Sequence, residues 1–119
     1  MVSSLSRQRY ISLTTFRKDG SAVSTPVWVV TDDGKRLLVW TGSQTWKAKR
    51  IRRDSHVLVA ASTIRGRERG LRIDGTARIV DVDVRALIRA KYGWQMRLLE
   101  RFNGSGDDGS IAIEIVDAT

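Results

Sequence analysis

The chain has 119 residues, of which 41% are hydrophobic and 29% charged, the size and composition of one globular domain. We therefore expect a single domain over residues 1–119. It contains no cysteine and one histidine, His56, which excludes a disulfide scaffold, a thiolate nucleophile and cysteine-ligated zinc. No apolar run reaches the roughly 18 residues of a spanning helix, and the N-terminal MVSSLSRQRY lacks a secretion signal, so we expect a cytoplasmic protein that does not enter the membrane.

The charge is strongly basic. Twenty-one lysines and arginines against thirteen acidic residues give a formal net charge of +8. Such a surplus favours an anionic partner, which leaves nucleic acid, an acidic membrane face or a phosphorylated small molecule open.

The first third of the chain predicts three strands, over Tyr10–Phe16, Val23–Val30 and Leu37–Thr41, because these runs are rich in β-branched and aromatic residues. Turn signals separate them, at Asp19-Gly20 and at Asp32-Asp33-Gly34. Short turns between strands predict an antiparallel meander.

A short helix follows over Gln44–Arg53, with Ser43 or Thr45 as its cap. Further on, a helix is expected from the N-cap Asp83 to Phe102. The remaining expected strands are Val57–Ala61, Leu71–Val80, in which Gly75 marks a bulge or a close backbone approach, and a last one with alternating Ile111, Ile113 and Ile115. Six short strands and two helices predict a mainly β fold, a small antiparallel barrel.

The densest functional signal lies between Thr41 and Arg53, TGSQTWKAKRIRR. Here a strand ends, a glycine-containing loop follows and a helix opens, so that free backbone N–H groups, hydroxyls and the ammonium of Lys47 form a plausible phosphate cradle. The alternative is a solvated basic helix.

Pro26 lies within a strand, where it removes a ladder donor, and this predicts an edge or a bulge. With Thr25 and Trp28 beside it, such a strand suits hydrogen bonding to the rim of a planar ring. An ordinary edge strand with Trp28 in the core fits the sequence equally well.

No protein group is a convincing catalyst. His56 reads as a surface residue, and paired carboxylates, a Ser-His-Asp set and a Walker-type loop are missing. If the protein is an enzyme, a bound cofactor supplies the reactive group. A second basic cluster, either an anion site or merely a solvated loop, comprises Arg65, Arg67, Arg69 and Arg72.

Three segments in this order carry a resemblance: LTTFRKDGSAVSTPVWVV, LLVWTGSQTWKAKRIRRDSHVLVAA and IDGTARIVD. The chain resembles the pyridoxamine 5′-phosphate oxidase-like split-barrel superfamily, and most of all its small members that bind the deazaflavin coenzyme F-420. The likeness covers nearly the whole chain, including KYGWQMRLLERF in the expected second helix.

The resemblance implies a split β-barrel that works as a homodimer, with a cofactor in each of two interface grooves and the second helix capping one barrel mouth. It implies that Lys47 binds the cofactor phosphate. It further places Trp40, Thr41 and Trp46 beside that phosphate, and the strand of Thr25, Pro26, Val27 and Trp28 along the tricyclic ring.

Two departures bear on the cofactor and the reaction. FMN-dependent pyridoxamine oxidases of this superfamily carry arginines where Thr25 and Trp46 stand, and a C-terminal substrate-binding tail that this chain, ending at Thr119, lacks. We therefore expect no pyridoxamine oxidation. The departures leave FMN and F-420 open, and the likeness to the small F-420-binding members makes F-420 the preferred cofactor, with the arginines of the 65–72 loop near its acidic tail.

The leading expectation is an oxidoreductase that transfers hydride between the bound cofactor and a small-molecule substrate, with no catalytic residue named. A non-catalytic cofactor carrier or sensor is the alternative. A basic nucleic-acid-binding barrel ranks well below both, because the cations gather at one helix start and one loop.

Overall fold

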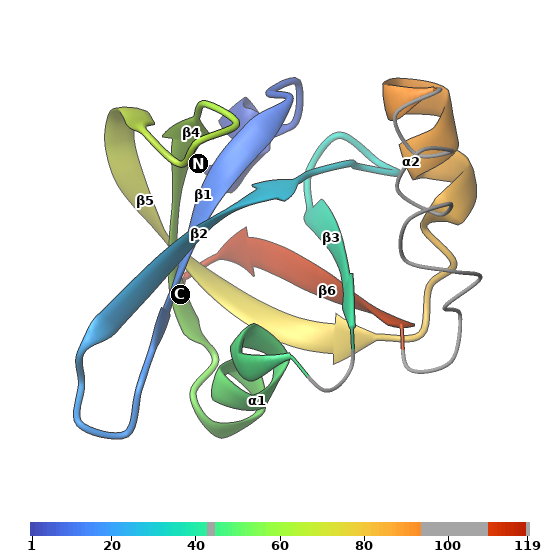
Figure 1. Ribbon diagram of the computed structural model, residues 1–119. Coiled ribbons are helices and arrows are strands. Elements are labelled where there is room, and N and C mark those ends of the chain that lie inside the picture. The colour runs from blue at the N-terminus through green and yellow to red at the C-terminus, as the bar shows by residue number, and fades with distance from the viewer. Residues whose placement is uncertain (43–44, 94–109, 119) are drawn as a thin grey trace.

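The computed structural model describes residues 1–42, 45–93 and 110–118, without the side chain of Ser110. Its strands form one curled antiparallel sheet in the order β2-β1-β4-β5-β6-β3 (Figure 1). The strands are β1 (Tyr10–Phe16), β2 (Ala22–Trp28), β3 (Leu37–Gly42), β4 (His56–Ser62), β5 (Glu68–Val80) and β6 (Ser110–Asp117). The helices are the 3-10 turn η1 (Val2–Leu5), α1 (Trp46–Arg53) and α2 (Arg85–Tyr92). The predicted mainly β fold, with six antiparallel strands and two helices, is confirmed.

The predicted three-stranded meander is only half right. β1 and β2 form the expected hairpin, but β3 pairs along its length with β6 and meets the chain after β2 only at one bridge, Val30↔Leu38. The turn before β3 explains this pairing. Arg36 bonds to Asp32 in the turn and to Glu114 of β6, which ties the start of β3 to β6.

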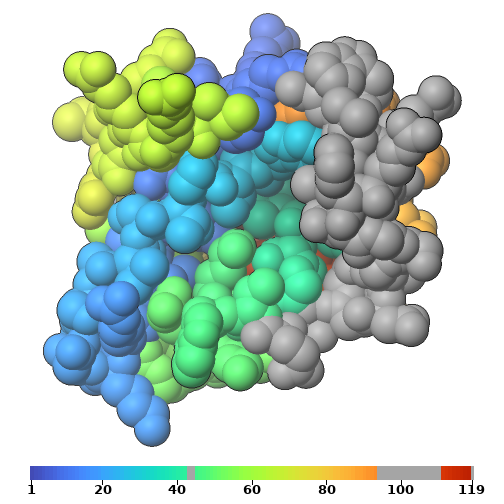
Figure 2. Space-filling view, in the orientation of Figure 1, coloured from blue at the N-terminus to red at the C-terminus, as the bar shows by residue number. Residues whose placement is uncertain are grey.

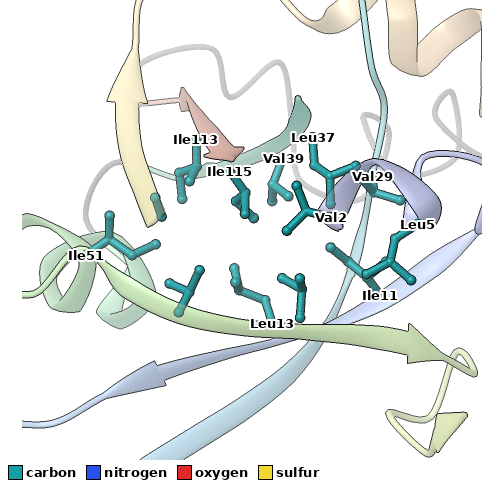
Figure 3. Packing of buried hydrophobic residues seen from close by; sticks show 13 residues of the cluster. Val2, Leu5, Ile11, Leu13, Val29, Leu37, Val39, Ile51, Ile113 and Ile115 are labelled. Atoms are coloured by element: carbon teal, nitrogen blue, oxygen red, sulfur yellow. The ribbon is translucent and has the colours of Figure 1, made fainter. Parts of the chain in front are cut away.

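Alternate residues of the strands fill the barrel interior (Figure 3). η1 and α1 add side chains to the same core, so that each packs on the barrel. The buried cluster consists of Val2, Leu5, Ile11, Leu13, Val29, Leu37, Val39, Ile51, Val57, Val59, Ala77, Ile113 and Ile115.

α2 covers the outward face of the sheet, and the expectation that it caps a barrel mouth is wrong. Its buried stripe packs against Leu38 and Ala112, which point away from the interior because their neighbours on β3 and β6 point into it. The N-cap of α2 is Val84 and not the predicted Asp83, although Asp83 accepts a hydrogen bond from the Arg85 amide (3.0 Å). The described helix ends at Tyr92, before Gly93 with φ 55°, and the rest of the helix predicted to Phe102 lies outside the described residues.

Gly75 marks a close backbone approach, as predicted. A Cβ there would lie 3.0 Å from the Cγ2 atom of Ile115 and 3.2 Å from the carbonyl oxygen of Val116, whereas the register shift lies in β4, between Val59 and Ala61. Leu71 alternates with Ile73, Ala77 and Ile79 along β5, a pattern that predicts a shared buried side, but Leu71 is instead 88% exposed. It precedes the part of β5 that pairs with β6, so no strand covers it.

Glu114 is the one buried carboxylate among the described residues. It accepts hydrogen bonds from Arg36 (2.7 Å) and Arg78 (2.6 Å), and these lower the pKa of its carboxyl below the ordinary 4.5. A lowered pKa means that the ionised form stabilises the fold above pH 4.5, and that this stabilisation is lost as the pH falls through the folded-state value.

We predict that Glu114→Gln lowers the free energy of unfolding at pH 7 by about 1–3 kcal/mol, because both guanidinium groups lose a charged acceptor. The loss should shrink as the pH falls below 4.5. Urea unfolding between pH 3 and pH 7 measures it, with the exposed Asp81→Asn as control. A deficit that stays constant over this range would contradict the assignment.

Neither of the two α-helices in the described part of the chain has the length and apolar character needed to span a bilayer.

Candidate cofactor-binding site

The barrel is open along one seam. β2 and β3 are the two edges of the sheet, and they join only through the reciprocal hydrogen bonds of Val30 and Leu38, at 2.9 and 2.7 Å. Beyond this bridge β2 runs back toward Pro26 while β3 runs forward to Gly42, and within the described residues neither edge has a further strand partner there. We call this opening the seam. It leaves backbone donors and acceptors of both strands free for a ligand.

Pro26 lies on this free edge, as predicted from its missing N–H. Its register partner is Ser12 of β1, and its own side chain is exposed, while Thr25 and Val27 on either side are half-buried. The β4–β5 loop approaches it closely, since a Cβ on Gly66 would lie 3.4 Å from the Pro26 Cδ atom.

Trp28 is half-buried and held in place. Its ring stacks on that of Tyr92 from α2, with centroids 4.3 Å apart and planes 9° from parallel. Trp40 of β3 packs in the same outer cluster. This packing agrees with the interpretation in which Trp28 belongs to a hydrophobic core. It also fixes the indole at the end of β2, next to the seam.

Tyr92 and Lys91 anchor this end of β2. The Tyr92 hydroxyl accepts from the Val29 amide (3.0 Å) and donates to the Arg9 carbonyl (2.6 Å), and burial raises the pKa of Tyr92 to about 12. The Lys91 ammonium donates to the carbonyl of Val29 (2.7 Å) and to two carbonyls that precede β1. The spacing of Val84, Ile88 and Tyr92 is that of one buried helical stripe, but nothing local in the sequence revealed these distant acceptors.

The other side of the seam ends at α1. Thr45 is the N-cap, as one of the two predictions had it: its hydroxyl accepts from the Ala48 amide (3.4 Å) and its carbonyl accepts from the Lys49 amide (3.1 Å). The Thr41 hydroxyl lies 3.4 Å from that of Thr45. The other predicted cap, Ser43, lies outside the described residues.

Lys47 lies in the first turn of α1 and is half-buried. Burial, with the nearby charge of Arg50 second, lowers the pKa of its ammonium from the ordinary 10.5. Within the described part of the chain it has no carboxylate or hydrogen-bond partner. A desolvated cation at the positive end of a helix is unfavourable by itself, so the arrangement suits an anion.

Trp46 precedes Lys47, but its side chain turns to the exposed face of the helix and is 69% exposed. The structure thus brings together Thr25, Pro26, Val27, Trp28 and Trp40 along or beside the seam, and Thr41 and Lys47 where β3 passes into α1. Figure 2 shows β2 and α1 on one face of the molecule with β3 between them.

The arginines of the β4–β5 hairpin differ from one another. Arg72 forms a bidentate pair with Glu68 (2.7 and 3.0 Å), which also accepts from Ser12. Arg65 and Arg67 flank Gly66 and therefore lie near Pro26 on the free edge of β2. Of these arginines, Arg65 and Arg67 are thus the ones placed to reach a ligand at the seam.

His56 is a surface residue, as expected. Its ring stacks on Phe16 at 5.1 Å and its Nε2 atom lies 2.9 Å from an Asp74 oxygen. Across the described residues no group of three or more histidine and acidic side chains is placed to hold a metal ion.

The sequence profile of the family described as Pyridoxamine 5′-phosphate oxidase matches residues 1–118, so the chain belongs to this family. No protein of curated function matches the sequence.

Solved structures share the fold at low identity. An F-420 reductase is 20% identical, with a TM-score of 0.67 and 99% of this chain and 93% of that chain covered. HutZ, the heme storage protein from Vibrio cholerae, is 13% identical, with a TM-score of 0.62 and coverages of 95% and 84%. An FAD-binding protein from Mesorhizobium loti is 16% identical, with a TM-score of 0.59 and coverages of 97% and 83%. The functions of these three proteins differ, so the fold is shared and the function is decided by the site.

The residues at the seam fit a phosphorylated flavin-type cofactor. Lys47 supplies an unpartnered ammonium. The Trp46 and Lys47 amides have no acceptor among the described residues, because the first N–H groups of a helix have no carbonyl one turn before them. The next two amides, of Ala48 and Lys49, bond to Thr45. The free edge of β2 offers backbone groups to a planar ring. Phosphate and ring therefore each find donors of suitable chemistry.

We predict that Tyr92→Phe lowers the free energy of unfolding by about 1–3 kcal/mol, because the buried Val29 amide loses its acceptor. Tyr92→Leu should cost about 0.5–1.5 kcal/mol more, since stacking on Trp28 is lost as well. Urea unfolding measures both. Tyr10→Phe is the matched control, because the Tyr10 hydroxyl has no hydrogen bond among the described residues, and an equal effect of this control would contradict the prediction.

Proposed function

We propose that this protein is an oxidoreductase that binds a phosphate-bearing flavin-type cofactor, with deazaflavin F-420 preferred to FMN, and transfers hydride to a small-molecule acceptor. The observation that carries the proposal is Lys47: a half-buried cation without an anion among the described residues, at a helix start beside an open barrel seam. Family membership and the fold shared with an F-420 reductase support it.

In this proposal the phosphate is held by the Lys47 ammonium, the Trp46 and Lys47 amides and the Thr41 hydroxyl. The backbone of Thr25 and Val27 hydrogen-bonds the rim of the ring, while Pro26, which has no N–H, leaves one position without a donor. Trp28 and Trp40, packed in one cluster, keep the two walls of the seam in place.

A bound flavin or deazaflavin supplies two-electron hydride chemistry, and the chain's own residues bind and orient it. No side chain at the seam is positioned as a general acid in the described part of the chain, so the proton that completes a reduction comes from solvent. The acceptor is a small unsaturated or quinone-like molecule.

Pyridoxamine 5′-phosphate is not the proposed substrate, although the family carries that name. Thr25 and Trp46 stand where the pyridoxamine oxidases that this chain resembles carry arginines, and two fewer cations weaken the binding of a second phosphorylated molecule.

We predict that Lys47→Ala weakens FMN and F-420 binding about tenfold to a hundredfold, the effect of losing a charge-assisted hydrogen bond of about 1.5–3 kcal/mol. Fluorescence titration measures both affinities. Riboflavin, which has the ring but no phosphate, should bind the variant and the parent equally. Lys35→Ala removes the same charge from a distant turn and should change neither affinity.

Unchanged binding of FMN and F-420 to Lys47→Ala would overturn the phosphate site. Whether the protein turns over or only carries its cofactor is a separate measurement. The reduced cofactor complex is mixed with a panel of quinones and enones, and oxidation is followed by absorbance. The FAD-binding relative favours the carrier alternative, and a complex that reduces no acceptor would establish it.

We also propose that the protein is a homodimer in which a second copy covers the exposed end of the β4–β5 hairpin. On this hairpin Ile64 is 64% exposed and Leu71 is 88% exposed, and its loop lies at Gly66 against Pro26 on the free edge of β2. Burying a leucine stabilises an interface by about 1.5–3 kcal/mol, and covering the hairpin would also shield the seam from water.

The prediction is that Leu71→Glu shifts the protein from dimer to monomer. Sedimentation velocity at several concentrations measures the shift. Lys35→Glu introduces the same acid at a remote turn and should stay dimeric. A Leu71→Glu protein with the parent's dimer constant would contradict the proposed interface.

A further inference from the structure

A basic groove lies between the β1–β2 hairpin and the exposed face of α1 and has a volume of about 620 Å³. Figure 2 shows the hairpin and α1 next to each other on this face. The described lining residues are Arg17, Lys18, Trp46, Lys49, Arg50 and Arg53, which we call the basic groove.

Five of the six lining residues are cations, and none is an acid. Within the described part of the chain Lys18, Lys49, Arg50 and Arg53 form no ion pair. By contrast, Arg36, Arg72 and Arg78 are each paired with a carboxylate. Like charges gathered in one groove repel each other, so the groove favours a ligand that carries more than one negative charge.

The spacing of α1 produces the groove. Residues 46, 49, 50 and 53 follow the i, i+3, i+4, i+7 pattern and share one face, while Ala48 and Ile51 on the opposite face are buried in the protein. Hydrogen bonds fix both walls: Arg53 donates to the Phe16 carbonyl, and Arg17 donates to the Ser21 hydroxyl (3.1 Å). Arg17 and Arg53 are therefore positioned before any ligand binds.

Trp46 adds a flat apolar surface to this cationic setting. Its side chain is 69% exposed, and the Lys49 ammonium lies 4.8 Å from the ring centroid on one side. An exposed indole beside several cations suits a ligand that has both an aromatic ring and phosphates.

We propose that the basic groove binds a nucleoside diphosphate or triphosphate, with the phosphates on Lys18, Arg50 and Arg17 and the base against Trp46. The volume falls within the roughly 300–1,000 Å³ of small-molecule sites. The side chains of the groove differ from those of the proposed cofactor site, because Lys47 is not among the lining residues; the two sites share only Trp46, which gives its side chain to the groove and its backbone amide to the phosphate.

Isothermal titration of the full chain with ADP tests the proposal, with pyrophosphate as the ligand that lacks a base. We expect the double variant Lys18→Ala/Arg50→Ala to lose at least tenfold in affinity for both. Trp46→Leu should weaken ADP severalfold and leave pyrophosphate unchanged. The double variant Lys35→Ala/Arg7→Ala removes the same two charges outside the groove and should bind like the parent protein.

Absence of ADP binding in the parent protein, or equal losses in the two double variants, would overturn the proposal. So would a longer oligothymidylate that binds more tightly than ADP with a steep salt dependence, because this would make the groove a nucleic-acid surface. Loss of ADP binding in Lys47→Ala, or its displacement by saturating FMN, would likewise overturn it by merging the groove with the cofactor site. Retained ADP binding in Lys47→Ala supports two sites, whatever the outcome for flavin.

Discussion

One bridge, between Val30 and Leu38, holds together a barrel whose two sheet edges otherwise stay apart. A six-stranded sheet curls far enough for its edges to meet, yet here they meet at one point only. Had the pairing continued from the bridge toward Pro26 and Gly42, the backbone groups of both edges would be satisfied and the seam would not exist. The missing proline N–H and the departure of the chain into α1 both oppose that continuation.

Because the edges are left open, the structure must secure them by other means. α2 packs on the outward face of β3, and its last residues, Lys91 and Tyr92, bond to the backbone at the end of β2. Glu114 and Arg36 tie the start of β3 to β6. The seam is thus framed by buried hydrogen bonds and ion pairs on both sides, which keeps its walls rigid without closing it.

The positive charge of the protein is distributed unevenly. Arg36, Arg72 and Arg78 are neutralised by carboxylates, whereas four cations of α1 and the β1–β2 hairpin form no ion pair in the described part of the chain: Lys18, Lys49, Arg50 and Arg53. The presence of a carboxylate partner therefore distinguishes the arginines that stabilise the fold from the cations that we propose bind a ligand. Relatives of this fold are described as a reductase, a heme storage protein and an FAD-binding protein, so it is this local distribution, more than the fold, that indicates which ligands this chain binds.

The sequence by itself determined the strands, the hairpin of β1 and β2 and the edge position of Pro26, and it narrowed the cap of α1 to Ser43 or Thr45, because each depends on local backbone preferences and hydrophobic period. It also identified the residues of the seam, partly through family resemblance, although their role in binding stays a prediction. Only the tertiary structure decided that β3 pairs with β6, that α2 covers an outer face, that Leu71 is exposed and that Trp46 turns into a basic groove. These depend on contacts between residues far apart in the chain, such as Arg36 with Glu114 and Tyr92 with Val29, and local sequence patterns do not encode which distant groups meet.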